Sequence, residues 1–361
     1  MLTTLETVAL RGGATMTIRM FEPPEDDTAR RLVYFLRHKD DDSLRGIRQR
    51  VLGQYADHCL DRYFIGEVEG AIIGHAWYGL PRVAPTVSGG GVSRSASETA
   101  APTREEATRG IGNFGHVYTN PDWRGQGVAR EITRVLVDHF NAEPTGSCLL
   151  CTASAESGHI YQKFGFRFIP PTAKSGPMGL IKPSVAGSFA ELDEAYFAPG
   201  RPVTVCEGHI GHRHDLDRML DFSVPWIEAR RHWHFVALAS RVPTFISALH
   251  YVEDGRGVLN VLQTDAGSVV GYAFALNLGS RFEQGLRTFD RVVHPRYLAQ
   301  AHVLLDETLC RAGAPVYAFV AECDEAKLTA LLAAGFGEHS RFASAFHLAG
   351  EPHDVVLLQW A

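Results

Sequence analysis

The middle of the chain alternates between strand-like and helix-like patterns. Residues 114–119 are rich in aromatic and β-branched side chains, which predicts a strand. After it come residues 120–127, which include two glycines. The next apolar positions recur at helical spacing, namely Val128, Ile132, Val135, Leu136 and Phe140. This spacing predicts a helix, so the pattern places a strand, a glycine-containing turn and a helix N-terminus in direct succession.

A turn of this kind suits an anion. The first N–H groups of a helix have no intrahelical partner, and the helix dipole adds partial positive charge at the same end. Gly125 and Gly127 let the backbone approach an anion closely because they have no Cβ. Arg124 adds a charge that can make forked contacts with phosphate oxygens. Residues 124–129 are therefore a candidate phosphate-binding loop.

The sequence here resembles the GNAT superfamily of acyl-CoA-dependent N-acyltransferases. The loop of that family reads Gln or Arg, two residues, Gly, one residue, then Gly or Ala, and Arg124, Gly127 and Ala129 fill these positions. The Pro-x-aromatic-Arg lead-in begins at Pro121. Residues 161–166 match a later family motif, Tyr-x-Lys-x-Gly-Phe. Two motifs in the right order indicate the family far more strongly than one glycine loop does.

The resemblance implies acetyl-CoA or another short acyl-CoA as cosubstrate, without a metal ion. It implies that the strand before the loop pairs with the pantetheine arm, and that a backbone N–H near Tyr118 or Thr119 polarises the thioester carbonyl. Ser154 stands where family members often have an Asn that contacts CoA. The expected CoA-binding residues are Tyr118, Thr119, Arg124, Gly125, Gln126, Gly127, Val128, Ala129 and Ser154.

Two catalytic residues follow from the resemblance. Tyr161 matches the usual proton donor to the departing thiolate, although packing of a helix on the sheet is the alternative role. His116 is the candidate general base because it is the titratable group near neutrality on the strand before the loop. Since strand side chains alternate, His116 could face away from the site. His75, Glu67 and a water molecule are then the alternatives.

The chain also contains an internal repeat. Residues 63–80 and residues 258–278 both read as β-hairpins, and each is followed by a strand, a helix, a strand and a helix ending at a Gly-Phe pair. The predicted fold class is α/β, with two tandem GNAT folds, each a mixed, mostly antiparallel sheet flanked by helices. In the second copy, Leu298, Ala301 and Val303 replace Arg124, Gly127 and Ala129. The second copy is therefore expected to be degenerate.

The predicted domains are an N-terminal catalytic domain at residues 1–185, a linker at 186–200 and a degenerate domain at 201–361. The first copy carries about 23 extra residues within 82–110, a stretch rich in glycine and serine. Such a stretch buries little apolar surface, so we expect a mobile insertion, either a lid over the acceptor or a tolerated surface loop. The arrangement loosely resembles that of mycothiol synthases, in which the C-terminal copy is the active one.

Composition narrows the function further. The net charge of −6, without a basic stripe, disfavours nucleic-acid binding. No apolar run reaches the roughly 20 residues that span a membrane, and the N-terminus lacks a secretion signal, so we expect a cytoplasmic protein without a membrane partner. Cys148 and Cys151 have zinc-like spacing but lie in a predicted buried strand. His209, His212 and His214 have a spacing that could ligate zinc, but an ordinary polar loop in a histidine-rich stretch is the favoured interpretation, so no metal site is predicted.

The sequence thus predicts an N-acyltransferase that moves an acetyl or other short acyl group from acyl-CoA to a primary amine of a small metabolite. An acyl-CoA decarboxylase or an O-acyltransferase of specialised metabolism is the enzymatic alternative. A non-catalytic acyl-CoA-binding protein is the alternative from another class. The intact loop and Tyr161 favour catalysis.

Overall fold

The computed structural model describes residues 1–38, 41–82, 110–223, 239, 242–278, 286–348 and 350–361. The chain divides into two compact units, Met1–Ala195 and Tyr196–Ala361. Each contains its own mixed β-sheet flanked by helices, as the predicted fold class requires. Within the described residues, no helix has both the length and the apolar character needed to cross a membrane.

The sheet of unit 1 has the order β1-β2-β3-β4-β5-β6-β8-β7. Its only parallel neighbours among the described strands are β5 and β6. The strands are β1 (Leu2–Ala9), β2 (Thr15–Phe21), β3 (Cys59–Val68), β4 (Ala71–Pro81), β5 (Ile111–Thr119), β6 (Cys148–Ala153), β7 (Arg167–Phe168) and β8 (Gly176–Ile181). The hairpin and the strand predicted from the alternating pattern are confirmed as β3, β4 and β5.

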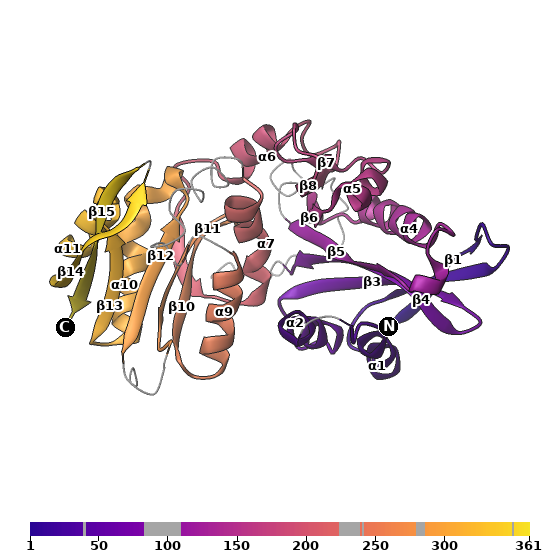
Figure 1. Cartoon of the computed structure of the whole chain (residues 1–361), viewed down its shortest axis with the longest axis horizontal. Helices are drawn as coiled ribbons and strands as arrows, with labels where there is room; N and C mark the ends of the chain where they lie inside the picture. The colour runs from indigo at the N-terminus through magenta and orange to yellow at the C-terminus, as the bar shows by residue number, and fades with distance from the viewer. Residues whose placement is uncertain (39–40, 83–109, 224–238, 240–241, 279–285, 349) are drawn as a thin grey trace, which may run out of the picture. The chain divides into compact units, whose positions relative to one another are not determined.

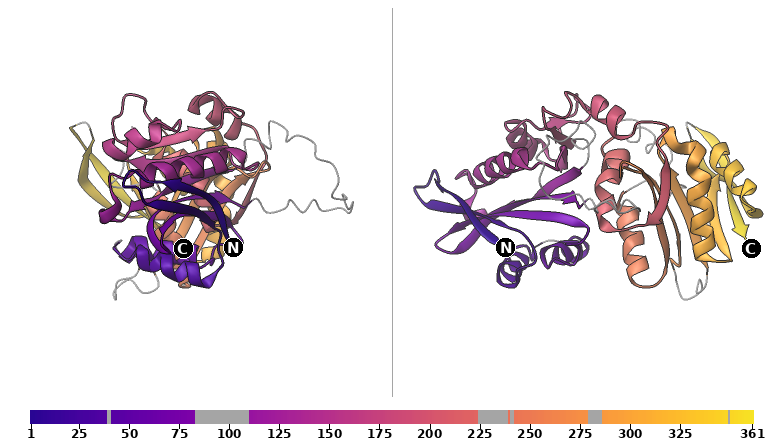
Figure 2. Two further views of the ribbon diagram at one scale, coloured as in Figure 1. Left: turned by 90° about the vertical axis from the view of Figure 1, so that its right-hand side faces the viewer. Right: turned by 180° about the vertical axis from the view of Figure 1, so that it is seen from behind.

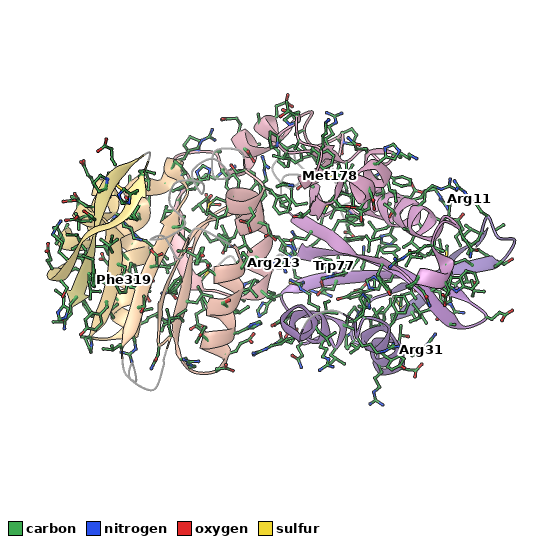
Figure 3. The ribbon with its side chains drawn as sticks, in the orientation of Figure 1. Arg11, Arg31, Trp77, Met178, Arg213 and Phe319 are labelled. Carbon is green, nitrogen blue, oxygen red and sulfur yellow. The ribbon has the colours of Figure 1, made fainter. Side chains whose placement is uncertain are left out.

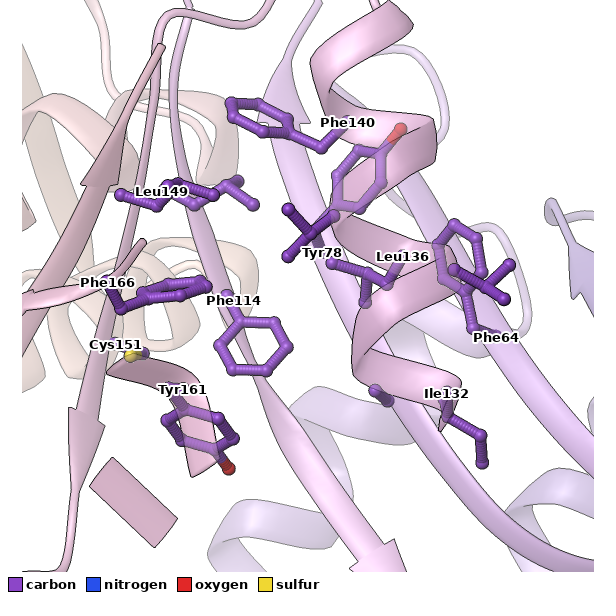
Figure 4. Packing of buried hydrophobic residues seen from close by; sticks show 14 of the residues in the cluster. Phe64, Tyr78, Phe114, Ile132, Leu136, Phe140, Leu149, Cys151, Tyr161 and Phe166 are labelled. Atoms are coloured by element: carbon purple, nitrogen blue, oxygen red, sulfur yellow. The ribbon is translucent and has the colours of Figure 1, made fainter. Parts of the chain in front are cut away.

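Helices cover both faces of this sheet (Figures 1 and 2). On one face, α1 (Asp26–Phe35) and α2 (Asp41–Val51) bury Leu32 and Ile47 against Tyr63 and Trp77. On the other face lie α4 (Val128–Ala142) and α5 (Ala155–Gln162). The stripe of apolar residues predicted on α4 packs there against β3, β4 and β5, as Figure 4 shows for Ile132, Leu136 and Phe140. The faces are referred to below as the α1 face and the α4 face.

Two irregularities in unit 1 shape its centre. The parallel pairing of β5 with β6 covers only the first three residues of β5, from Ile111 to Asn113. Beyond them the two strands have no registered pairs. On the other side of β5, Trp77 pairs with Gly115 and His75 pairs with Tyr118, so two residues of β5 oppose one residue of β4. This two-to-one count is a β-bulge, which breaks the alternation of side chains along the strand.

The sheet of unit 2 has the same strand order as unit 1 from β2 onward and has no described counterpart of β1. Its sheet runs β9-β10-β11-β12-β13-β15-β14, and β12 and β13 are its parallel neighbours. Its strands are β9 (Val203–Glu207), β10 (Gly257–Thr264), β11 (Val269–Leu276), β12 (Arg287–Val293), β13 (Val316–Ala321), β14 (Gly337–Leu348) and β15 (Glu351–Trp360). Its helices are α7 (Arg213–Leu216), α9 (Val242–Glu253), α10 (Ala301–Ala312) and α11 (Glu325–Ala333). That unit 2 is an eroded second copy stays a prediction.

The predicted linker contains a short helix. Residues 186–200 contain the helix α6 (Phe189–Tyr196), and the division between the units falls at its last turn. The Ser188 hydroxyl accepts a hydrogen bond from the backbone N–H of Glu191 at the start of α6, and Leu192 is fully buried. A cap and a buried apolar residue are sufficient for a short helix in a stretch without strong periodicity. The predicted insertion, residues 82–110, lies almost entirely outside the described residues.

Candidate active site

The predicted phosphate-binding loop lies between β5 and α4. A short 3-10 helix, η1 (Pro121–Trp123), follows β5, and the backbone then turns through Gly125 at φ +77° and Gly127 at φ +95°. Both angles lie in the left-handed region, which glycine adopts without strain. Gly127 is the N-cap of α4, and no side chain caps this helix end. The first N–H groups of α4 are therefore left for a ligand or water.

The loop is held by the turn between β1 and β2. The backbone N–H of Arg11, in this turn (Figure 3), donates to the carbonyl oxygen of Gln126 at 3.2 Å. The Gln126 side chain covers Gly12 so closely that a Cβ on Gly12 would come within 2.6 Å of Oε1. Gln126, predicted as a CoA contact, thus also fixes the loop. Local sequence did not indicate this contact, because the two segments are more than 100 residues apart.

The loop fits a diphosphate. A Cβ added to Gly125 or Gly127 would meet no described atom within 4 Å, so the space beside both glycines is open. Arg124 makes one weak contact, from Nε to the carbonyl oxygen of Thr119 at 3.4 Å, which leaves most of its donors available. Val128 and Ala129 begin α4, where free N–H groups and the helix dipole favour an anion. These residues would hold the phosphates of an acyl-CoA.

His116 occupies the β-bulge. Its φ of +54° is left-handed, which is uncommon for a residue other than glycine. Its ring centroid lies 5.2 Å from that of Trp77, a residue packed on the α1 face. Sequence alternation left open which way His116 points. The bulge turns the His116 side chain toward Trp77, on the α1 face. Regular pairing resumes two positions further along, where Tyr118 pairs with His75.

Tyr161 lies on α5, on the α4 face. Its ring makes an edge contact with Phe114 at 4.9 Å between centroids and lies 5.9 Å from Phe166. Figure 4 shows its hydroxyl at the edge of this apolar cluster. Burial raises the pKa of the Tyr161 phenol, which keeps the hydroxyl protonated. The ring of Tyr161 therefore has the predicted packing role, and the role of its hydroxyl as proton donor stays a prediction.

Tyr118, Thr119 and Ser154 occupy different surroundings. Tyr118 and Thr119 end β5 beside the loop, and the buried Oγ1 of Thr119 has no hydrogen-bond partner among the described residues. Ser154 caps α5, where its hydroxyl accepts from the backbone N–H of Ser157 at 3.2 Å. The Ser154 hydroxyl is thus already engaged at a helix end, and a contact with CoA stays a prediction.

The two alternative bases are less suited than His116. The Glu67 carboxylate is paired with Arg19 at 3.1 Å and Arg31 at 2.6 Å, and its side chain is 8% exposed. Both carboxylate oxygens of Glu67 thus face arginine side chains. His75 is fully buried under Phe35, with 6.0 Å between the ring centroids. Neither side chain is accessible to an acceptor, whereas His116 is partly exposed.

A cavity that no sequence pattern indicated lies on the α1 face. It has a volume of about 250 Å³ and lies between the end of α1 and the end of β5. Its lining residues are Phe35, Arg37, His38, Tyr118, Asn120 and Pro121. The His38 ring stacks on the Tyr118 ring, with 3.9 Å between centroids and 27° between planes. Only the fold brings these two segments together, so no local pattern could have revealed the cavity.

Unit 2 lacks the features of the loop. The 3-10 helix η5 (Pro295–Gln300) leads directly into α10, so the free helix end is replaced by continuous helix. Leu298 and Val303 are exposed, and Ala301 is buried. The pairing of β11 with β12 runs from Leu276 to Gly271 without a shift, so unit 2 also lacks the bulge.

The predicted metal candidates have other roles. The Nδ1 atom of His209 accepts from the backbone N–H of Gly211, and that of His212 accepts from the backbone N–H of His209. Both rings thus cap a short helix, and His214 is buried. Cys148 and Cys151 are buried in β6, where Cys151 belongs to the apolar core. In the part of the chain that the structure describes, no three ligand-type side chains are grouped as a metal site.

Comparison with known proteins identifies part of this region. Residues 100–176 match the model of the acetyltransferase (GNAT) domain. No curated protein gives a significant match. Among solved structures, an acetyltransferase from Acinetobacter baylyi is 13% identical and covers 45% of this chain and 93% of its own, with a TM-score of 0.36.

Two further structures are similar at the same level. The phosphinothricin acetyltransferase of Sinorhizobium meliloti, solved with acetyl-CoA, is 16% identical, with 44% of this chain and 87% of that one covered and a TM-score of 0.36. The spermidine N-acetyltransferase of Vibrio cholerae, solved with CoA and spermine, is 12% identical, with 44% and 94% covered and a TM-score of 0.34. On the family model alone, the chain contains a segment that matches the acetyltransferase (GNAT) domain, and this segment includes β5, the candidate phosphate-binding loop, α4, β6 and α5.

Proposed function

We propose that unit 1 is an N-acyltransferase that moves an acetyl or other short acyl group from acyl-CoA to a primary amine of a small metabolite. The observation that carries this proposal is the succession of bulge, open glycine loop and uncapped helix in the segment that matches the GNAT domain. Acyl-CoA supplies an activated acyl group and a leaving thiolate. Arg124 and the first N–H groups of α4 bind its phosphates.

The transfer forms one C–N bond and breaks one C–S bond. The amine nitrogen attacks the thioester carbonyl, and a backbone N–H near Tyr118 or Thr119 donates to the carbonyl oxygen, where negative charge develops. His116 accepts the proton that the amine loses, directly or through water. The Tyr161 hydroxyl gives a proton to the thiolate sulfur. Burial raises the pKa of this phenol, which by itself opposes the transfer, so the step requires that bound acyl-CoA also excludes water from the departing thiolate and raises its basicity.

The open geometry of β5 supports the binding of an extended acyl-CoA arm. Among the described strands, registered pairs between β5 and β6 end at Asn113, so the two strands diverge where an extended acyl-CoA arm would lie. Decarboxylation or O-acylation would use the same loop. An amine is proposed because the loop and residues 161–166 resemble those of N-acyltransferases, and a neutral imidazole such as that of His116 can accept the proton that an amine loses.

The proposal is tested by two measurements on the whole chain. Calorimetry measures acetyl-CoA binding, and a thiol reagent measures CoA release in the presence of primary amines, alcohols or no acceptor. Amine-dependent release with an N-acylated product supports the proposal. Tight binding without release in any mixture would instead indicate a non-catalytic acyl-CoA-binding protein.

A further inference from the structure

The cavity on the α1 face lies beside the end of β5, directly after the β-bulge that contains His116. Tyr118 lines the cavity, and His116 precedes it by two residues on β5, which corresponds to roughly 7 Å along a strand. Both side chains are on the α1 face, since Tyr118 contacts Phe35 and His116 contacts Trp77. A molecule bound in the cavity could therefore extend a short chain toward the candidate base.

The walls of the cavity are mainly rings. Phe35 makes an edge contact with Tyr118 at 5.3 Å between centroids, and His38 stacks on the same Tyr118 ring. Pro121 adds a further apolar surface. A volume of about 250 Å³ is below the roughly 300–1,000 Å³ of sites for drug-sized ligands. The cavity therefore suits one ring with a short substituent.

The charge of the cavity argues against a polycation. Arg37 lines it, with its guanidinium 4.0 Å above the Tyr34 ring and NH1 donating to the Tyr34 carbonyl oxygen at 2.8 Å. Among the residues that the structure describes, the lining includes no carboxylate. On the same face, Glu67 is already paired with two arginines. A polyamine would therefore meet a cation here, and no carboxylate of the described lining balances it.

We propose that this cavity binds the acceptor of unit 1, and that the acceptor is a primary amine attached through a short chain to a single aromatic ring. The inference rests on the proposed acyl transfer and specifies its substrate class. The ring contacts Phe35, His38 and Tyr118, and the chain places the amine near His116. Aromatic contacts of this kind favour a flat ring over a saturated one of similar size.

The test compares 2-phenylethylamine with 2-cyclohexylethylamine, which has the same carbon skeleton but a puckered ring, and with spermidine. Calorimetry on the CoA-bound protein gives the affinity for each amine, and CoA release from acetyl-CoA gives kcat/KM. We expect the aromatic amine to exceed the saturated one by about 3- to 10-fold in both measurements. Equal values for the two ring amines, or a preference for spermidine, would overturn the inference.

Two variants test whether the cavity is the source of the preference for an aromatic ring. Phe35→Leu keeps an apolar side chain but removes a ring, and should reduce the preference to about 2-fold or less while acetyl-CoA affinity stays unchanged. Phe342→Leu removes an exposed ring in unit 2 and should leave the preference intact. An unchanged preference in Phe35→Leu would contradict the assigned cavity. A ring preference in binding without any CoA release would support the cavity and contradict the proposed acyl transfer, so the two failures are distinguishable.

Discussion

The ring of His116 lies 5.2 Å from the ring of Trp77, although the two residues are not paired across β4 and β5. Trp77 pairs with Gly115, and the bulge adds one residue to β5 before the next pair. The extra residue of the bulge requires a left-handed φ at His116, and such a conformation costs on the order of 1–3 kcal/mol in a residue other than glycine. Strain of this kind is often found at functional sites, which agrees with the proposed role of His116.

Replacing His116 with Asn tests that role. Asn tolerates a left-handed φ better than most residues, so His116→Asn should fold and bind acetyl-CoA normally. If His116 is the base, kcat/KM for the amine should fall by about 10²–10⁴-fold, and the acidic limb of the pH–rate profile between pH 5 and 8 should disappear. A wild-type pH profile in the variant would assign proton removal to another group or to water.

Replacing Tyr161 with Phe removes the hydroxyl and retains the ring that packs on Phe114. We expect unchanged acetyl-CoA affinity and thermal stability, with turnover lowered within the range of about 10²–10⁴-fold typical of proton-transfer groups. Single-turnover kinetics should show that chemistry limits the rate. Wild-type turnover under those conditions would leave Tyr161 with its packing role alone.

Replacing Gly127 with Asp should weaken acetyl-CoA binding at least about 10-fold, because a carboxylate at the N-cap of α4 repels a phosphate and the residue has φ +95°. Gly267→Asp is the matched control. Gly267 has φ +88° in an open turn of unit 2, so the control carries the same backbone strain without touching the loop. Equal affinity in both variants, measured by calorimetry, would reject the loop as the phosphate site.

The stability of the protein should depend on pH through Asp215, which is buried in unit 2. Its carboxylate accepts from the Tyr196 hydroxyl at 2.6 Å and from the backbone N–H of Val269 at 2.8 Å. Burial raises the pKa of Asp215 from 3.8 to about 7. Between about pH 4 and pH 7 the folded chain thus binds more protons than the unfolded chain, so stability falls as the pH rises through this window.

Asp215→Asn should remove this dependence. The Asn side chain can still accept from Val269 and can donate to the Tyr196 oxygen, so both contacts survive without a charge. Urea denaturation from pH 4 to pH 8 should show a flatter stability curve for Asp215→Asn than for wild type. Asp306→Asn, at an exposed position of α10, is the control and should follow the wild-type curve. Parallel curves for all three proteins would contradict the raised pKa.

Much of the site could be predicted from local sequence. The glycines of the loop, the start of α4 at Val128 and the position of Tyr161 near a Gly-Phe pair depend on residues that are close together in the chain. Helix periodicity and glycine's access to left-handed angles operate over a few residues, so a single sequence reveals them. The same holds for the loss of the loop at Leu298 and Ala301, where η5 replaces it.

Only the tertiary structure decided which way His116 points and what surrounds it. A bulge depends on the register between β4 and β5, and register is set by packing between strands that the insertion separates in sequence. The cavity of Phe35, His38 and Tyr118 likewise requires α1 to lie on the sheet beside the end of β5. Sequence therefore determined the groups suited to bind phosphates and donate a proton. Long-range packing determined the surroundings of the base and formed the cavity, because those contacts join residues about 40 positions apart at His116 and Trp77 and about 80 positions apart at His38 and Tyr118.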